Sequence, residues 1–357
     1  MNHILNLFND SDSARLSAFL AKNSITDYKV EPIGEDMAPR RYYRLKASGI
    51  DAPIILCVSV PDAHPDAHPG SLIKNTISIS RQLAAQGIKA PHVIDADPKQ
   101  GFVLLDDFGD IRFDQAIKRG LLNKEEAYRL AAEVSQKIQN LTPIHTLPNY
   151  YESYVHTARG RLVEWYMPIA SQQRQDPVLI TEYLTLWDQV EQAAAPQKLV
   201  FSHIDFHLMN LMYLPDEQGT DRCGVLDFQG AMKASYAYDL VNLLGDARRL
   251  VDPALKAQII DGFTANMNPA ERADFDDHYA ILSAQFHSRC LGQFIQLAFM
   301  GKPQYLEYIP GLLQQFKADM DAPILKPIYE WLLAHNMDFD KAALVDIKRD
   351  GVFVGCG

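Results

Sequence analysis

The sequence predicts an α+β protein with a small β-rich N-terminal lobe and a larger, mainly helical C-terminal lobe. Three observations support this fold class. The chain has 357 residues, which exceeds the roughly 150 residues of a typical domain. Runs rich in Tyr, Val, Ile and Leu occupy residues 27–60, whereas apolar residues at helical spacing dominate from residue 108 onward. We therefore expect the lobes at residues 1–107 and 108–336, followed by a C-terminal tail at 337–357.

The N-terminal lobe is predicted to hold one helix before its strands and one between them. Residues 10–22 carry apolar side chains at helical spacing, behind Asp and Ser residues that could cap the helix. At 61–70 the prolines are spaced too closely for a helix or a central strand, which indicates a loop. A second helix is expected from Ser71 to Gln86 and ends at Gly87. The expected strands have the sequences YKVEPIG, RYYRLKA, PIILCVSV, HVIDA and GFVLLDD.

In the C-terminal lobe, the run EEAYRLAAEVSQKIQNL is predicted to form a helix. Its apolar residues recur every three or four positions and form one stripe, as in a helix that packs against a core. These residues are Ala127, Leu130, Val134, Ile138 and Leu141. The tail at 338–357 is expected to form a short strand or a poorly ordered end.

Charge and cysteine content exclude several classes of protein. The net charge is −11, from 34 basic and 45 acidic residues, which argues against binding to nucleic acid or to an anionic membrane surface. The four cysteines are scattered without a CxxC pair, so we expect neither a disulfide framework nor a structural zinc site. No apolar run approaches the ~20 residues of a spanning helix, and no signal peptide precedes the first acidic residues. We therefore expect a soluble cytoplasmic protein.

One segment, 201–229, carries residues suited to catalysis. It contains His203-x-Asp205, then Asn210 five residues after the aspartate, and then Asp227-Phe-Gln. Each residue taken alone could be a cap or a strand end, but their joint spacing favours function. We expect Asp205 to accept the proton of a hydroxyl that attacks a phosphoryl group. We expect His203 to have a structural role through hydrogen bonds to the backbone.

Two apolar runs within this segment, NLMYL and CGVLDF, could pair as an antiparallel hairpin. If Leu214 lies opposite Cys223, then Asn210 lies opposite Asp227. Directly opposed residues have Cβ atoms roughly 4.5–5.5 Å apart, so an amide oxygen and a carboxylate could share one cation. Oxygen ligands of this kind suit Mg²⁺, which leaves further positions for phosphate oxygens.

The motif HxDxxxxN followed by Asp-Phe resembles the catalytic loop of the protein-kinase-like fold, in particular of its aminoglycoside phosphotransferase branch. Within that branch, the chain is similar to the bacterial anomeric kinases that phosphorylate N-acetylmuramate and N-acetylglucosamine during cell-wall recycling. The segments that carry this similarity are PRRYYRL, DFQ and YAYDLVNLLGDARR, with weaker support from LVEWYMP and GFVLLDDFG. The resemblance covers residues 27–336 and implies a bilobal fold.

The resemblance also implies an ATP- and Mg²⁺-dependent kinase with roles at matching positions. Asp205 would be the catalytic base, with Asn210 and Asp227 as Mg²⁺ ligands. Asp239 resembles a buried aspartate that braces the catalytic loop. The backbone of Asp106 to Phe108 resembles the hinge that receives adenine.

The sequence departs from the protein-kinase pattern at the phosphate-binding lysine of the third strand. The corresponding run, Pro53 to Val60, contains no lysine. Candidates for a replacement are Arg41 and Arg44 on the preceding strand, expected on one face of it, and Lys74 on the following helix. The turn Gly34 to Pro39 resembles the loop that covers the nucleotide.

Two other functions stay open at this point. An aminoglycoside- or choline-type kinase would suit the net charge of −11, because cationic substrates favour acidic pockets. A pseudokinase-like module that binds nucleotide without catalysis is suggested by the missing lysine, although the retained polar motif argues against it. The expected partners are a sugar and ATP. The oligomeric state stays open, and a monomer is plausible.

Substrate contacts are expected near the helix that follows the metal motif. Asp246 and Arg248 are candidates for lining the substrate site, together with Arg249. An arginine there could bind the carboxylate of N-acetylmuramate with two hydrogen bonds. Trp165 and Tyr166 could stack on a sugar, although aromatic residues at helical spacing are more often part of a core.

Overall fold

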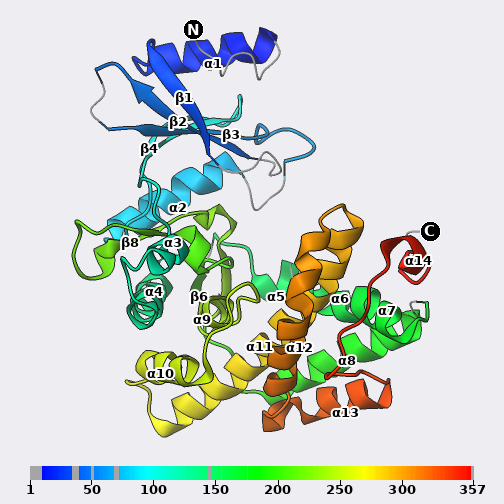
Figure 1. The fold of residues 1–357 in the computed structure, drawn as a ribbon. Coiled ribbons are helices and arrows are strands. Elements are labelled where there is room, and N and C mark those ends of the chain that lie inside the picture. The colour runs from blue at the N-terminus through cyan, green and yellow to red at the C-terminus, as the bar shows by residue number, and fades with distance from the viewer. Residues whose placement is uncertain are drawn as a thin grey trace. The chain divides into compact units, whose positions relative to one another are not determined.

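The structure is a computed structural model of the chain (Figure 1). It describes residues 10–33, 40–49, 52–67, 72–142, 146–153, 155–174 and 176–354. The chain divides into two compact units. The first unit comprises Met1–Thr142 and Leu208–Ala231, and the second comprises Pro143–His207 and Met232–Gly357. The expected nucleotide-covering turn, Gly34 to Pro39, lies outside the described residues.

A five-stranded antiparallel sheet in the order β1-β2-β3-β5-β4 forms the N-terminal part of the first unit. Each predicted strand and both predicted helices are present. The elements are α1 (Asp10–Lys22), β1 (Tyr28–Ile33), β2 (Arg41–Ala47), β3 (Ile54–Val58), α2 (Ile73–Ala85), β4 (Val93–Asp97) and β5 (Phe102–Asp106).

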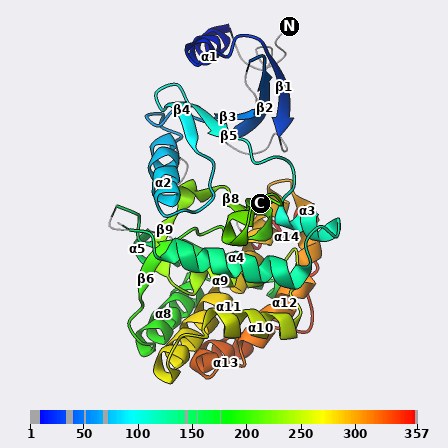
Figure 2. The ribbon, with the colours of Figure 1, turned by 90° about the vertical axis from the view of Figure 1, so that its left-hand side faces the viewer.

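The two faces of this sheet are covered by different helices (Figures 1 and 2). Alternate residues of a strand point to opposite faces, so one strand contributes to both clusters. On one face, Leu56 of β3 packs with Leu16 and Phe19 of α1. On the other face, Cys57 of β3 packs with Ile73 of α2. The sheet therefore lies between two apolar clusters.

The rest of the first unit consists of helices and a short hairpin. Its elements are α3 (Phe113–Lys118), α4 (Lys124–Gln139), η4 (Leu208–Asn210), β7 (Leu211–Tyr213), η5 (Gly219–Arg222), β8 (Cys223–Val225) and η6 (Phe228–Gly230). The prediction of α4 is confirmed, because its stripe from Ala127 to Ile138 is buried. The amide of Val225 in β8 donates to the carbonyl of Lys89 at 2.7 Å, which ties the hairpin to the segment before β4.

The helices of the second unit surround α11 (Pro269–Phe299), which has 31 residues and begins with a capping box at Asn268. One large apolar cluster joins α11 to its neighbours. The other elements are α5 (Tyr150–Ser153), α6 (Val155–Arg161), the π-helix η3 (Leu162–Tyr166), α7 (Met167–Ser171), α8 (Pro177–Ala193), β6 (Leu199–Ser202), β9 (Met232–Ser235), α9 (Tyr238–Leu244), α10 (Pro253–Phe263), η7 (Pro303–Tyr308), α12 (Ile309–Asp319), η8 (Pro323–Leu325), α13 (Lys326–Ala334) and α14 (Ile347–Asp350).

The C-terminal tail differs from the expected short strand or poorly ordered end. Its described part contains α14, and three of its apolar side chains are buried in the core of the second unit. These side chains belong to Met337, Phe339 and Val354. The hydroxyl of Tyr166 also accepts a hydrogen bond from the amide of Ala343 at 3.2 Å. Long-range apolar burial therefore orders a segment whose local sequence suggested a frayed end.

The two compact units are not divided at residue 107, where the boundary between the lobes was predicted. The lobe boundary therefore stays a prediction. Residues 108–142 and the β7–β8 hairpin group with the sheet. Within the described residues, no helix is long and apolar enough to cross a membrane.

Candidate active site

The loop that follows β6 is fixed by a buried carboxylate from α9. Asp239 accepts hydrogen bonds from the amides of His203, at 2.8 Å, and Ile204, at 3.0 Å. The Asp239 and His203 residues are each only 1% exposed. This is the arrangement that a bracing role for Asp239 requires.

Ile204 shows how tightly this loop is held. Its φ of 75° lies in the left-handed region, which is unusual for a β-branched residue. Such strain costs roughly 1–3 kcal/mol and persists only where the surroundings enforce it. Here the enforcing contact is the hydrogen bond from the Ile204 amide to Asp239. The reversal of the chain at Ile204 leads directly into Asp205.

Asp205 presents a carboxylate whose pKa is lowered, and its side chain is 59% exposed. The partial desolvation of Asp205 by the surrounding chain would by itself raise this pKa. The hydrogen bond and charge of His207, together with the charges of His203 and Arg248, lower it further than burial raises it. The Nε2 atom of His207 lies 3.2 Å from Oδ1 of Asp205. The contact between His207 and Asp205 depends on the conformation of the loop and is not predictable from the spacing of the sequence.

The hairpin in the first unit has a different register from the predicted one. Tyr213, not Leu214, pairs with Cys223. The 3₁₀ turn η5 ends at Arg222, whose carbonyl accepts the amide of Leu214 at 3.0 Å, and this closure shifts the pairing by one residue. The prediction that Asn210 lies directly opposite Asp227 is therefore wrong.

The observed register places Asn210 opposite Leu226, whose amide donates to the Asn210 carbonyl at 2.8 Å. Asp227 follows with a left-handed backbone, at φ 58°, and leaves the strand. Gln229 donates to Oδ1 of Asp227 at 2.6 Å, so the third residue of the Asp-Phe-Gln motif orients its first. Among the residues that the structure describes, no group of three His, Cys, Asp or Glu side chains forms a metal site. A Mg²⁺ site with one carboxylate and one amide oxygen, completed by phosphate, is chemically suited to Asp227 and Asn210.

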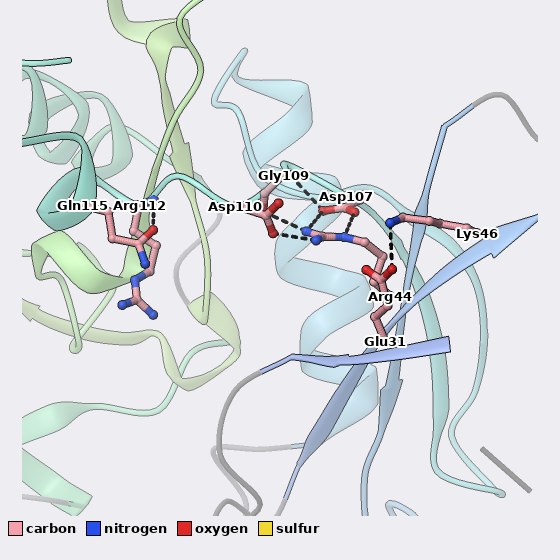
Figure 3. A network of polar contacts seen from close by, with 8 residues as sticks. All are labelled: Glu31, Arg44, Lys46, Asp107, Gly109, Asp110, Arg112 and Gln115. Atoms are coloured by element: carbon pink, nitrogen blue, oxygen red, sulfur yellow. Dashed lines mark hydrogen bonds and ion pairs between the residues drawn. The ribbon is translucent and has the colours of Figure 1, made fainter. Parts of the chain in front are cut away.

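Arg44 was a candidate for binding nucleotide phosphates, but the structure surrounds its guanidinium with other partners (Figure 3). Its Nη2 lies 3.0 Å from Oδ1 of Asp107 and 3.0 Å from the carbonyl of Gly109, and its Nε also contacts Asp107. Its Nη1 lies 2.5 Å from Oδ1 of Asp110. These contacts raise the pKa of Arg44, mainly through Asp107. Arg44 thus ties β2 to the segment after β5, and two carboxylates balance its charge.

The other two candidate cations are exposed. Arg41 lies three residues from Arg44 on the same strand, so the two point to opposite faces, and the expectation of a shared face is wrong. Lys74 is exposed at the start of α2.

The predicted hinge, Asp106 to Phe108, is held on both sides. The amide of Asp106 donates to the carbonyl of His92 at 3.2 Å. The ring of Phe108 packs on Gly224 of β8, where an added Cβ would lie 2.6 Å from Cδ2 of the ring. Only glycine allows this approach of the hinge to the hairpin.

The candidate substrate residues form an ion pair after α9. The Nε atom of Arg248 lies 2.7 Å from Oδ1 of Asp246, and its Nη2 lies 3.2 Å from Oδ2. Arg248 also contributes to the low pKa of Asp205, which places its charge near that carboxylate. Tyr166 is fully buried and Trp165 packs beside Phe299. These two aromatic residues therefore belong to the core and not to a sugar-stacking site.

These observations define a class of protein. A braced loop presents an ionised aspartate in the second unit, and the first unit joins an antiparallel sheet to a hairpin with Asn210 and Asp227. Such a combination is that of a kinase-like phosphotransferase. The chain belongs to the phosphotransferase enzyme family, whose sequence profile matches residues 29–275, and it is a kinase.

Individual relatives extend this assignment. An N-acetylmuramate/N-acetylglucosamine kinase of Caulobacter vibrioides is 30% identical, over 97% of this chain and 100% of the relative. The ethanolamine kinase of Plasmodium vivax has a TM-score of 0.59 at 12% identity, covering 88% of each chain. An aminoglycoside 2′-phosphotransferase in complex with GDP has a TM-score of 0.58 at 16% identity, covering 87% of this chain and 99% of the other. These structural similarities confirm the predicted α+β, kinase-like fold.

Proposed function

We propose that this protein is an ATP- and Mg²⁺-dependent kinase that phosphorylates the anomeric hydroxyl of an amino sugar, N-acetylmuramate or N-acetylglucosamine. The observation that carries the proposal is the ionised, exposed carboxylate of Asp205 on a loop that Asp239 holds in a strained conformation. The choice of sugar is supported by the relative from Caulobacter vibrioides, whose name states this activity.

In this mechanism Asp205 orients the attacking hydroxyl and accepts its proton as the phosphoryl group is transferred. A carboxylate of low pKa is a weak base, but phosphoryl transfer depends mainly on positioning and on neutralising charge. Asn210 and Asp227 would hold Mg²⁺, which supplies charge neutralisation to the phosphates. The nucleotide would meet the backbone of Asp106 to Phe108. ATP dependence and buried free thiols fit a cytoplasmic location.

The proposal is tested with a panel of acceptors and a coupled assay of ADP release. The panel contains both amino sugars, an aminoglycoside and choline, so that the alternative kinase classes are measured in parallel. Phosphorus NMR of the product distinguishes a sugar 1-phosphate from phosphorylation at another hydroxyl. Turnover of only the aminoglycoside or only choline would overturn the choice of substrate.

The role of Asp205 is tested by Asp205→Asn, with Asp216→Asn as the matched control. Asp216 is an exposed carboxylate in the loop between β7 and β8. We expect Asp205→Asn to fold normally and to lose at least about 10²-fold in kcat, because general base catalysis contributes about 10²–10⁴-fold. The control should keep the wild-type rate. Wild-type turnover in folded Asp205→Asn would exclude Asp205 as the base.

A further inference from the structure

A cavity of about 490 Å³ lies in the second unit, where the end of α11 meets α14 and the π-helix η3. Its volume falls within the roughly 300–1,000 Å³ of sites that hold small molecules. Its walls come from η3, the last turn of α11 and the segment 347–352. These are not the segments of the proposed reaction, so the cavity is a separate feature of the second unit.

The shape of the cavity starts from a glycine that brings α11 against η3. A Cβ atom at Gly292 would overlap the carbonyl oxygen of Arg161, so only glycine allows this approach. Gln296 and Met300 follow Gly292 at intervals of four residues, which places them along the same face of the chain. The π-helix contributes Trp165 from the other side. Widened turns of this kind are frequent at functional sites.

Several large apolar side chains are exposed around this cavity. Met300, Ile347 and Val352 are 69%, 37% and 42% exposed, and all three line it. Trp165 and Phe299 form the rest of the apolar wall, with their ring centroids 6.1 Å apart. Exposed apolar residues that gather in one place indicate a binding site, whereas residues scattered singly do not.

The charged side chains of the wall are cations, although the net charge of the chain is −11. Arg349 is neutralised by the buried carboxylate of Asp350, since its Nε lies 2.5 Å from Oδ1 and its Nη2 3.1 Å from Oδ2. Lys348 is exposed, and within the described part of the chain its ammonium group forms no hydrogen bond or ion pair. The side-chain amide of Gln296 is likewise unengaged among those residues. An ammonium group and an amide donor beside an apolar wall complement an anion.

A larger cavity of about 640 Å³, between α8 and α13, has the opposite charge. Glu182 is its charged wall residue, and Trp331 also lines it. An anionic ligand is therefore disfavoured there by a carboxylate, whereas Lys348 attracts it at α14. The two cavities give different predictions for one ligand, and each contains a tryptophan that can report on it.

We propose that the cavity beside α14 binds a medium-chain carboxylate, with its apolar body against Trp165 and Met300 and its carboxylate on Lys348 and Gln296. One unpaired cation balances a monoanion such as a carboxylate, and not the double charge of a phosphate monoester. Burial of the apolar body supplies affinity in proportion to the area removed from water. The inference goes beyond the proposed function, because it requires neither nucleotide nor sugar.

The first test compares three eight-carbon probes by calorimetry: octanoate, octan-1-ol and octylammonium. We expect octanoate to bind about 10-fold more tightly than octan-1-ol, as for a hydrogen bond to a charged group, and octylammonium to bind more weakly than both. Lys348→Gln should lose about 10-fold in octanoate affinity and keep its affinity for octan-1-ol. The matched control is Lys341→Gln, which removes an exposed lysine of the same tail and should change neither affinity.

The second test places a negative charge in the apolar wall. Val352→Asp should lose at least about 10-fold in octanoate affinity, because a carboxylate is repelled by a like charge and loses apolar contact. The matched control is Leu344→Asp, at a residue of the same tail that is 83% exposed and does not line the cavity. Both residues are exposed, so both variants should fold, which circular dichroism checks.

The third test locates the ligand with 8-bromooctanoate, whose bromine quenches tryptophan fluorescence on contact. The chain has three tryptophans, Trp165, Trp187 and Trp331. Quenching should persist in Trp331→Phe and disappear in Trp165→Phe. The inference is overturned if Trp331 is the residue quenched, if octan-1-ol binds as tightly as octanoate, or if Val352→Asp binds octanoate like the wild type. Phosphoryl transfer enters none of these measurements, so this inference and the proposed function stand or fail separately.

Discussion

Replacing Asp239 by asparagine tests whether one buried carboxylate holds the loop that presents Asp205. The carboxylate accepts two backbone amides, and an amide side chain has a single acceptor oxygen. Asp239→Asn therefore leaves one buried N–H group without its acceptor. A hydrogen bond to a charged group contributes about 1.5–3 kcal/mol, and at 1% exposure solvent cannot replace it.

A second effect acts in the opposite direction. Burial raises the pKa of Asp239 by more than His203 and the two backbone hydrogen bonds lower it. Ionised Asp239 is thus less favourable in the folded chain than in the unfolded one, and the substitution removes that cost. We expect a net loss of about 1–2 kcal/mol in the free energy of unfolding. Because the folded pKa is raised, the Asp239 contribution weakens as pH rises above the ordinary carboxyl range, and the variant lacks this dependence.

The effect on catalysis should exceed the effect on stability. Once Asp239 no longer restrains it, Ile204 can leave its left-handed conformation at φ 75° and move the adjacent Asp205. A displacement of about 1 Å can cost about 10²-fold in rate, so we expect a loss of that size in kcat. Urea denaturation measures the stability, and the ADP-release assay measures kcat at a temperature where all variants are folded.

The control is Asn242→Ala, which alters another buried polar residue of α9. Its side chain donates to the carbonyl of Tyr238 within the same helix, at 3.0 Å. We expect a comparable loss of stability with nearly normal kcat. If Asp239→Asn loses stability but keeps the wild-type kcat, the reasoning that links Asp239 to the geometry of Asp205 is wrong.

Two further predictions concern charged pairs. His207→Ala removes the main group that lowers the pKa of Asp205, so this pKa should rise and the acidic limb of the kcat/KM profile should move to higher pH. If the acidic limb stays at the wild-type pH, His207 does not control the ionisation of Asp205. Arg44→Gln leaves Asp107, whose side chain is 5% exposed, without its ion pair, and should cost about 3–5 kcal/mol of stability by thermal or urea unfolding. Lys46→Gln, on the same strand but about half-exposed, should change stability by less than about 1 kcal/mol. Equal effects of the two substitutions would contradict the importance assigned to Arg44.

Local sequence patterns were sufficient for much of this protein. The α4 stripe from Ala127 to Ile138 predicted a buried helix because the period of an α-helix is expressed directly in the sequence. The N-terminal third predicted the sheet because its runs rich in Tyr, Val, Ile and Leu, separated by turn residues, are typical of strands. The HxDxxxxN and Asp-Phe motif indicated a phosphotransferase, because chemistry of this kind needs a base and metal ligands at short separations.

Tertiary structure decided the features that depend on contacts between distant segments. The hairpin register shifted by one residue because the turn η5 closes at Arg222, and strand alternation alone does not specify a turn. The tail became ordered because Phe339 and Val354 find an apolar cluster far away in the sequence. Arg40, Arg41 and Arg44 look alike in the sequence PRRYYRL. In the structure Arg40 is buried against α2, Arg41 is exposed to solvent and Arg44 pairs with Asp107. Each environment depends on which other elements pack around β2.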